Sequence, residues 1–138
     1  MTEDVVARAT IAEPAAIVHD WFQGMHGSER VVEAMRSGLF APDDGPDIFT
    51  FAAAHELLPP ELSRRIRRES RLSRLPGIRR RGHDQGRWRY LLPYMPYYFR
   101  SLDLDPYDVV ISSSHACAVN VRPREDALHV CYCYTPMR

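Results

Sequence analysis

Lysine is absent from this chain: all 18 basic residues among its 138 are arginine, and 18 aspartates and glutamates balance them to a formal net charge of zero. Whole-molecule charge therefore gives no reason to expect a nucleic-acid partner. No apolar run approaches the roughly 20 residues that a transmembrane helix needs, and the acidic start MTEDVVARATIAEP lacks the apolar core of a signal peptide. We expect a cytoplasmic protein, or one that lies peripherally on the cytoplasmic face of a membrane.

Cysteine is also scarce, and the odd set of Cys117, Cys131 and Cys133 indicates a reducing compartment. Cys131 and Cys133 stand two apart on a predicted strand, where they cannot easily bridge each other. His129 alternates with them on the same face, which raises the alternative of a metal site. Because zinc sites usually pair two Cys-x2-Cys clusters and no second cluster exists here, we expect no metal; small buried residues on a parallel strand are the favoured interpretation.

Apolar patterning predicts one α/β domain over residues 15–138, after a disordered leader at 1–14. Short apolar or β-branched runs predict strands at 15–21, 47–52, 107–114 and 127–135. Helices are predicted at 28–40 and 59–70, with a short irregular or strand piece near 70–74 and a broken helix around Pro93 and Pro96. This alternation favours a Rossmann-like parallel sheet with helices on both faces.

The first candidate binding residues follow the first strand, because ligands of doubly wound sheets collect at the carboxyl ends of the strands. Asp20, next to a histidine, lies near the end of this strand, and a loop with Gly24 and Gly27 follows. The glycines allow close approach of a ligand, and the helix that begins near Ser28, a plausible N-cap, presents free N–H groups. The pattern favours a phosphate or a sugar hydroxyl; a tight strand-to-helix turn is the structural alternative.

The later strands carry the other candidates. Three serines at 112–114 end a buried strand, and His115 follows them, where it could donate to a ligand or shuttle a proton. A serine nucleophile would need a G-x-S-x-G turn, which is absent. The structural alternative is that the serines cap the next helix and that His115 is a satisfied turn residue. Beyond the last strand, Thr135 and Arg138 could reach a bound anion.

A basic stretch lies between these motifs. Residues 64–89 hold eleven arginines against Glu69 and Asp84, and aromatic residues continue to Phe99. One interpretation is a solvated helix with the aromatics in the core. Another is a surface that lies on anionic lipid, where each arginine near the headgroups contributes about 1 kcal/mol at most. A nucleic-acid patch is the third, but a charge-balanced protein with no RNA-binding motif makes a poor general nucleic-acid binder.

Four longer stretches, in order, resemble a known family. They are AIVHDWFQGMHGSERVVEAM, DIFTF, YDVVISSSHACAVNV and ALHVCYCYTPMR. Together they are similar to the N-terminal half of bacterial family-4 glycosyltransferases, in the mannosyltransferase-like set that assembles polysaccharides and glycolipids. The resemblance covers nearly the whole chain after residue 14, and several motifs in the right order make it more specific than any one of them.

The resemblance implies half of a GT-B architecture, in which two Rossmann-like domains face each other across a cleft. Such enzymes transfer a sugar from a nucleotide sugar with retention of anomeric configuration, usually without metal. The N-terminal domain mainly holds the acceptor, and the C-terminal domain grips the nucleotide sugar and carries an acidic E-x7-E motif. We therefore expect the C-terminal donor domain to be absent and the chain to be inactive alone, with a GDP- or UDP-sugar as substrate and no further cofactor.

The resemblance also implies roles for individual residues. His115 matches the histidine that lines the cleft near the transferred sugar, and it is the predicted catalytic residue. Gly24 and Gly27 match the glycine loop that faces the donor phosphates and the acceptor, and Glu29 matches the acid of that loop. We predict that these three residues bind substrate.

Two residues depart from the family pattern. Ser28 stands where the family often has the second glycine of a pair, so the backbone is less free there. Tyr134 replaces a histidine of the terminal motif; tyrosine can donate a hydrogen bond but does not titrate near neutral pH. Thr135 and Arg138 match the same terminal motif. Together with Asp20, these residues complete the predicted substrate-binding set.

The expected partners are a nucleotide sugar and a glycan or glycolipid acceptor, with no nucleic acid. Self-association, or a separate subunit that carries the C-terminal domain, would complete the cleft. A second interpretation is a non-catalytic binding or membrane-docking module, derived from such an enzyme, that contacts an anionic membrane through residues 64–99. A third, a flavodoxin-like or other nucleotide-binding domain, fits the sheet pattern but not the ordered motifs.

Overall fold

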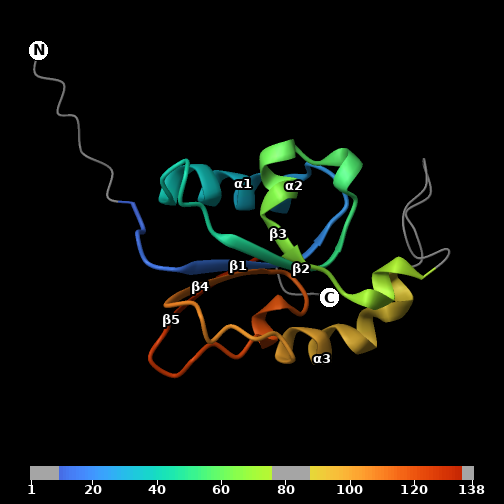
Figure 1. The fold of residues 1–138 in the computed structure, drawn as a ribbon. Helices are drawn as coiled ribbons and strands as arrows, with labels where there is room; N and C mark the ends of the chain where they lie inside the picture. The colour runs from blue at the N-terminus through green and yellow to red at the C-terminus, as the bar shows by residue number, and fades with distance from the viewer. Residues whose placement is uncertain (1–9, 76–87, 135–138) are drawn as a thin grey trace, which may run out of the picture.

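Five parallel strands form one sheet in the computed structural model of the chain, which describes residues 10–75 and 88–134 (Figure 1). The strands lie in the order β3-β2-β1-β4-β5 across the sheet. In chain order they are β1 Ala15–Phe22, β2 Asp47–Ala53, β3 Ile66–Arg68, β4 Val109–Ser114 and β5 Leu128–Cys133. The expected α/β, Rossmann-like fold class is confirmed.

Helices cover both faces of this sheet, with α1 and α2 on one face and α3 on the other (Figure 1). They are α1 Gly27–Leu39, α2 Pro60–Arg65 and α3 Met95–Arg100. Short 3-10 turns connect the elements: η1 His55–Leu57, η2 Arg71–Arg74, η3 Trp88–Tyr94 and η4 Ala118–Asn120. Across the two described ranges, no helix has the length and apolar character needed to cross a bilayer.

Side chains of β1 alternate between two apolar clusters, one on each face of the sheet. Ile17 belongs to the cluster that contains Val32 of α1. Val18 belongs to the cluster that contains Met95 and Phe99 of α3. All five side chains are fully shielded from solvent. A parallel sheet between two helical layers requires this burial on both faces, which explains why β1 begins as an unbroken apolar run.

The strand order reverses between β1 and β4, which creates the switch point where ligands of open α/β sheets bind. His19 of β1 stands opposite Ser113 of β4. The pairing of β4 with β5 continues as far as Ser114, opposite Cys133. The carboxyl ends of β1, β4 and β5 are therefore neighbours, as the sequence predicts.

The first predicted helix begins one residue earlier than expected, at Gly27. His26 is its N-cap, and no side chain caps this end. Ser28, predicted as the N-cap, is instead the second residue of α1, and its hydroxyl donates to the Glu29 carboxylate at 3.0 Å. The N-cap prediction for Ser28 is thus wrong, because the preceding loop is shorter than the sequence pattern indicates.

The helix predicted over 59–70 is also wrong in part. It ends at Arg65 and gives way to β3, whose Ile66 and Arg68 pair with β2. The piece near 70–74 contains the 3-10 turn η2 rather than a strand. A strand of three residues is too short to show the alternation of apolar and polar side chains that identifies a strand. Two of its three residues are arginines, so it also lacks an apolar run.

Residues before Ala15 already form backbone contacts with the rest of the chain. Ile11 forms a β-bridge with Phe40, and its N–H donates to the Leu39 carbonyl at 2.8 Å. The carbonyl of Pro14 accepts from two backbone N–H groups at the start of β4. The predicted disordered leader therefore does not extend to Pro14, and its first nine residues lie outside the described ranges.

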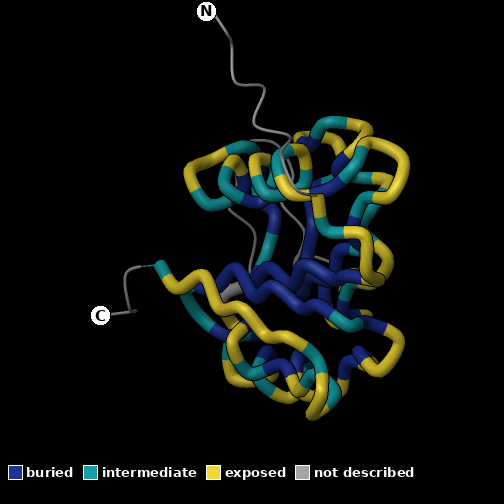
Figure 2. Tube along the Cα trace, turned by 90° about the vertical axis from the view of Figure 1, so that its left-hand side faces the viewer, coloured by how far each residue is buried: buried dark blue, intermediate teal, exposed yellow. Residues whose placement is uncertain are grey.

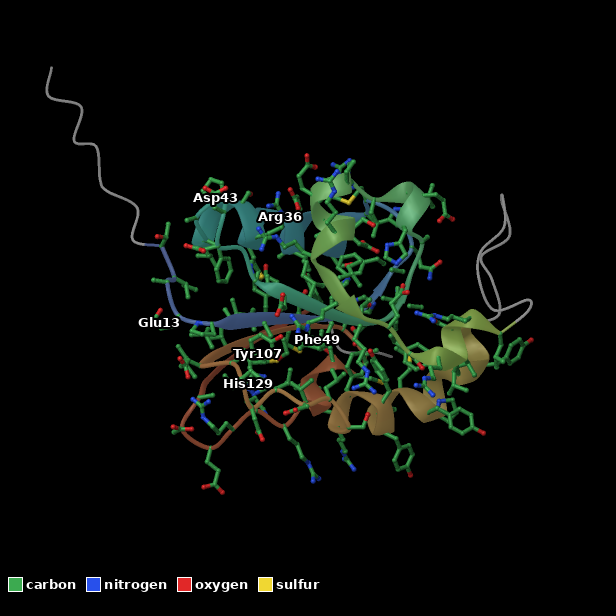
Figure 3. All side chains as sticks on the ribbon, viewed as in Figure 1. Glu13, Arg36, Asp43, Phe49, Tyr107 and His129 are labelled. Atoms are coloured by element: carbon green, nitrogen blue, oxygen red, sulfur yellow. The ribbon has the colours of Figure 1, made fainter. Side chains whose placement is uncertain are left out.

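Tyr107 explains why β4 begins two residues after the predicted start at 107. Its hydroxyl donates to Asp47 at 2.5 Å, and its ring packs edge-on against Phe49 at a centroid distance of 5.7 Å (Figure 3). Burial is the largest cause of a raised pKa of Tyr107, and the hydrogen bond to Asp47 is the second. The side chain thus fastens the loop before β4 to β2 and does not extend the strand.

The last strand was expected to be buried, and the structure contradicts this. All six residues of β5 are exposed (Figure 2). Leu128, Val130 and Tyr132 keep 60%, 45% and 46% of their surface accessible. Because β5 is the edge strand and the described helices leave both of its faces accessible, its apolar composition does not report burial.

Candidate functional site

Asp20 joins the end of β1 to the turn that follows β4. Its carboxylate is fully shielded from solvent and accepts four backbone N–H groups from residues 115–118, at 2.6 to 3.0 Å. The Ser114 hydroxyl donates a longer bond of 3.5 Å. Successive N–H groups that converge in this way form an anion-binding concavity, and here the protein's own carboxylate fills it. Asp20 therefore positions the 115–118 turn, and direct contact with a substrate would require some of these bonds to break.

His115 is held by the same turn and keeps part of its imidazole accessible. The exposed fraction of its side chain is 27%, and Nδ1 lies 3.7 Å from Oδ2 of Asp20. The ring meets the indole of Trp21 edge-on at a centroid distance of 4.7 Å, and the ring of Tyr134 at 5.8 Å. Because two aromatic rings limit its orientations, the accessible edge of the imidazole has a set direction. Such a group can donate a hydrogen bond to a sugar hydroxyl or accept one from it.

A chain of hydrogen bonds connects β1, β4, the end of β5 and α1. Nδ1 of His19 lies 3.0 Å from the carbonyl oxygen of Ser113. Because a carbonyl only accepts, Nδ1 carries the proton, and the buried Nε2 has no hydrogen-bond partner among the described residues. The Ser113 hydroxyl lies 2.9 Å from the hydroxyl of Tyr134, which donates to the Ser28 carbonyl at 3.3 Å.

Burial shifts the pKa values at both ends of this chain. It lowers the pKa of His19 below its ordinary 6.5, against the attraction of the neighbouring Asp20 carboxylate. It also raises the pKa of Tyr134 above its ordinary 10, although the bond to Ser113 opposes this. Both groups are therefore neutral near pH 7, and the Tyr134 hydroxyl acts there as a hydrogen-bond donor.

The loop between β1 and α1 needs a glycine at one position. Gly24 has a φ of +140°, a conformation that other residues rarely adopt. A Cβ atom at Gly24 would also lie 3.4 Å from Nε2 of His26, whereas one at Gly27 would meet nothing within 4 Å. The conformational requirement thus falls on Gly24, and Gly27 leaves open space at the start of α1.

Glu29 occupies the positive end of the α1 dipole. Its carboxylate is buried and accepts from the Ser28 hydroxyl at 3.0 Å and from the backbone N–H of Gln23 at 3.4 Å. Asp20 thus places a buried carboxylate at backbone N–H groups that could otherwise bind a phosphate, and Glu29 adds a second buried carboxylate in the first turn of α1. The switch point consequently favours a neutral, hydroxyl-rich ligand over a phosphate.

Two predicted site residues, Thr135 and Arg138, lie outside the described ranges. His129 lies near the start of β5, opposite Val110, and therefore away from the carboxyl ends that form the switch point; its Nε2 lies 2.9 Å from the hydroxyl of Ser112. Cys131 and Cys133 are free and exposed. In the part of the chain that the structure describes, no group of three or more His, Cys, Asp or Glu side chains could hold a metal ion.

Glu61 and Glu69 happen to have the E-x7-E spacing that the resemblance assigns to the donor domain. Glu61 lies in the first turn of α2. Glu69 follows β3, where Oε1 lies 3.1 Å from Nε2 of His55. Because β3 separates the two glutamates, this spacing does not place their carboxylates on one helix.

Sequence reasoning missed the aromatic and backbone parts of the site. Trp21 was not singled out, although it follows Asp20 directly and packs on His115. The N–H groups of residues 115–118 carry no residue-type signal, so no sequence pattern could have paired them with Asp20. The histidine at 19 and the serine at 113 were noted, but their contact depends on strand order, which the sequence does not state.

No protein-family model, curated protein or solved structure matches the chain. The family resemblance therefore rests on the motifs and on the positions that the fold gives them. The residues of three motifs end β1, β4 and β5, and they meet at the switch point of the sheet.

Replacing Asp20 by alanine is expected to lower the free energy of unfolding by about 3 kcal/mol or more, because buried N–H donors without partners cost roughly 1–3 kcal/mol each. The matched control is Asp43→Ala, at an exposed position (Figure 3), where the change should stay within about 0.5 kcal/mol. Urea unfolding of both variants measures the difference. Equal stability of the two variants would show that Asp20 does not hold the turn.

The lowered pKa of His19 predicts acid sensitivity. A histidine with a lowered folded-state pKa binds fewer protons when folded than when unfolded, so its contribution to stability is complete above pH 6.5 and declines as the pH falls below it. The free energy of unfolding should fall there by up to about 1.4 kcal/mol per pH unit. His19→Gln is expected to flatten this slope between pH 7 and 5, whereas His26→Gln, on the exposed loop, should retain it. An unchanged slope in His19→Gln would contradict the assignment.

Proposed function

We propose that this chain is the acceptor-binding domain of a retaining glycosyltransferase that moves a sugar from a nucleotide sugar to a polysaccharide or lipid-linked acceptor. One observation carries the proposal: His115, the first turn of α1 and Tyr134 meet at the switch point of a Rossmann-like sheet. Each of them belongs to a motif that resembles the family, and ligands of open α/β sheets bind at this point. Neither composition nor net charge offers a comparably specific alternative.

The chemistry of the site supports an acceptor role rather than a donor role. The Asp20 carboxylate already takes the N–H groups of the 115–118 turn, and the Glu29 carboxylate adds a negative charge in the first turn of α1, which disfavours a nucleotide phosphate there. A sugar offers hydroxyls, which can both donate to and accept from the accessible imidazole of His115. In the proposal, a second domain grips the nucleotide sugar and stabilises the departing nucleotide.

Each residue of the site has a part in this proposal. His115 hydrogen-bonds the sugar at the reacting centre, and Trp21 supplies an apolar wall against which a sugar ring can pack. Asp20 and Glu29 position the two loops that carry the contacts. Tyr134 is a neutral donor where the family has a histidine, so transfer here cannot depend on a titrating group at that position.

A titration with simple glycosides tests the binding half of the proposal. Methyl α-mannopyranoside and methyl α-glucopyranoside, added to the nitrogen-15-labelled chain, should shift the amide resonances of residues 24–29 and 115–118. His115→Ala should weaken binding of the preferred glycoside by roughly tenfold, because a sugar hydroxyl loses its hydrogen-bond partner. His129→Ala is the matched control, since its imidazole is turned toward Ser112, and should bind as the unaltered chain does. Shifts confined to another surface, or full affinity in His115→Ala, would contradict the proposed site.

A turnover assay tests the division of labour between two domains. Incubated alone with GDP-mannose or UDP-glucose and a lipid-linked acceptor, the chain is expected to transfer no sugar, because the proposal assigns donor binding to a second domain. Chromatography of the released nucleotide measures the reaction. Transfer that depends on His115 without any second polypeptide would refute this division.

A further inference from the structure

An arginine-lined cavity lies beside the switch point, at the carboxyl ends of β2 and β3. Its volume is about 580 Å³, within the range of about 300–1,000 Å³ that is usual for small-ligand sites. Arg68, Arg71 and Arg74 line it together with Arg67. His55, Ile66, Glu69 and Tyr98 complete the lining. Four arginines against one glutamate give this cavity a positive charge.

The arginines differ in whether a carboxylate already neutralises them. Nη1 of Arg67 lies 3.2 Å from Oδ2 of Asp47. The guanidinium groups of Arg68, Arg71 and Arg74 form no ion pair with any carboxylate in residues 10–75 and 88–134. Glu69, the one acid in the lining, is largely buried and is engaged by His55 at 3.1 Å. Within the described ranges, three arginines of the lining are thus without a carboxylate partner.

The frame of the cavity is fixed, although its arginines reach into solvent. Ser70, between β3 and η2, donates its N–H to the Phe51 carbonyl of β2 at 3.0 Å, and its hydroxyl caps η2 at Leu72. The hydroxyl of Tyr98 donates to the Thr50 carbonyl at 2.8 Å. These bonds hold the backbone of η2 and the Tyr98 side chain of α3 against β2, so the backbone positions from which the arginines extend are fixed.

We propose that this cavity, lined by Arg68, Arg71 and Arg74, is a binding site for a phosphate or diphosphate group. Guanidinium groups bind phosphate oxygens through paired, charge-assisted hydrogen bonds, and three of them suit a group that carries several negative charges. At the switch point, the Asp20 carboxylate fills the N–H groups of the 115–118 turn and Glu29 adds a second negative charge, so the two parts of this edge of the sheet favour different ligands. The proposal does not depend on the glycosyltransferase assignment.

A charge-matched pair of variants tests it. Inorganic pyrophosphate is titrated calorimetrically into the unaltered chain, into Arg71→Gln/Arg74→Gln and into Arg100→Gln/Arg122→Gln, at low ionic strength. All four residues are exposed, so both pairs remove two charges without disturbing the core. Arg71→Gln/Arg74→Gln, the cavity pair, should weaken pyrophosphate binding by roughly tenfold or more. Arg100→Gln/Arg122→Gln, the control pair, should weaken it by less than about twofold. Thermal unfolding of each variant verifies the fold.

Vesicle co-sedimentation distinguishes the source of the phosphate. Phosphatidylcholine vesicles with and without phosphatidic acid are pelleted with the same three proteins. Pyrophosphate binding that is lost in the cavity pair assigns the site to soluble phosphorylated compounds. The site is assigned to lipid headgroups if the chain pellets only with vesicles that contain phosphatidic acid, and if the cavity pair loses this pelleting while the control pair keeps it. Equal losses in both pairs, or no binding of either probe, would overturn the proposal.

Discussion

The contact between the Asp20 carboxylate and the backbone of residues 115–118 fixes the geometry of the switch point. Four N–H groups that are remote in sequence converge on one buried side chain, so the end of β1 and the turn after β4 cannot move independently. The position of His115, the start of η4 and the contact between His115 and Trp21 all follow from it. If the bonds to Asp20 were broken, several buried N–H donors would lack partners, so a substitution of Asp20 is poorly tolerated.

The carboxyl edge of the sheet is divided by charge. Beside β1 and β4, Asp20 accepts from backbone N–H groups, and Glu29 accepts from the Ser28 hydroxyl and the Gln23 N–H. The rings of Trp21 and Tyr134 lie against the imidazole of His115. Beside β2 and β3, arginines that lack carboxylate partners among the described residues line a cavity. Under the two proposals, a neutral sugar and a phosphate group would bind at different places along this edge of the sheet.

Much of this architecture could be predicted from the sequence, because apolar runs and helical periodicity are local signals. The helix α1 and the strands β1, β2 and β4 were located to within one or two residues. β3 was missed because three residues with two arginines show no pattern, and β5 was misjudged because its edge position depends on strand order. The role of Asp20 was also inaccessible, since its partners lie 95 to 98 residues away and are backbone groups.

The two edges of the sheet differ in what they offer to another chain. β3 is three residues long and carries Arg67 and Arg68, and a short, charged strand discourages further pairing. β5 has six residues, LHVCYC, without a charged side chain or a proline, and both of its faces are accessible. Judged from the described residues, an additional strand would therefore pair more readily with the edge of β5 than with that of β3.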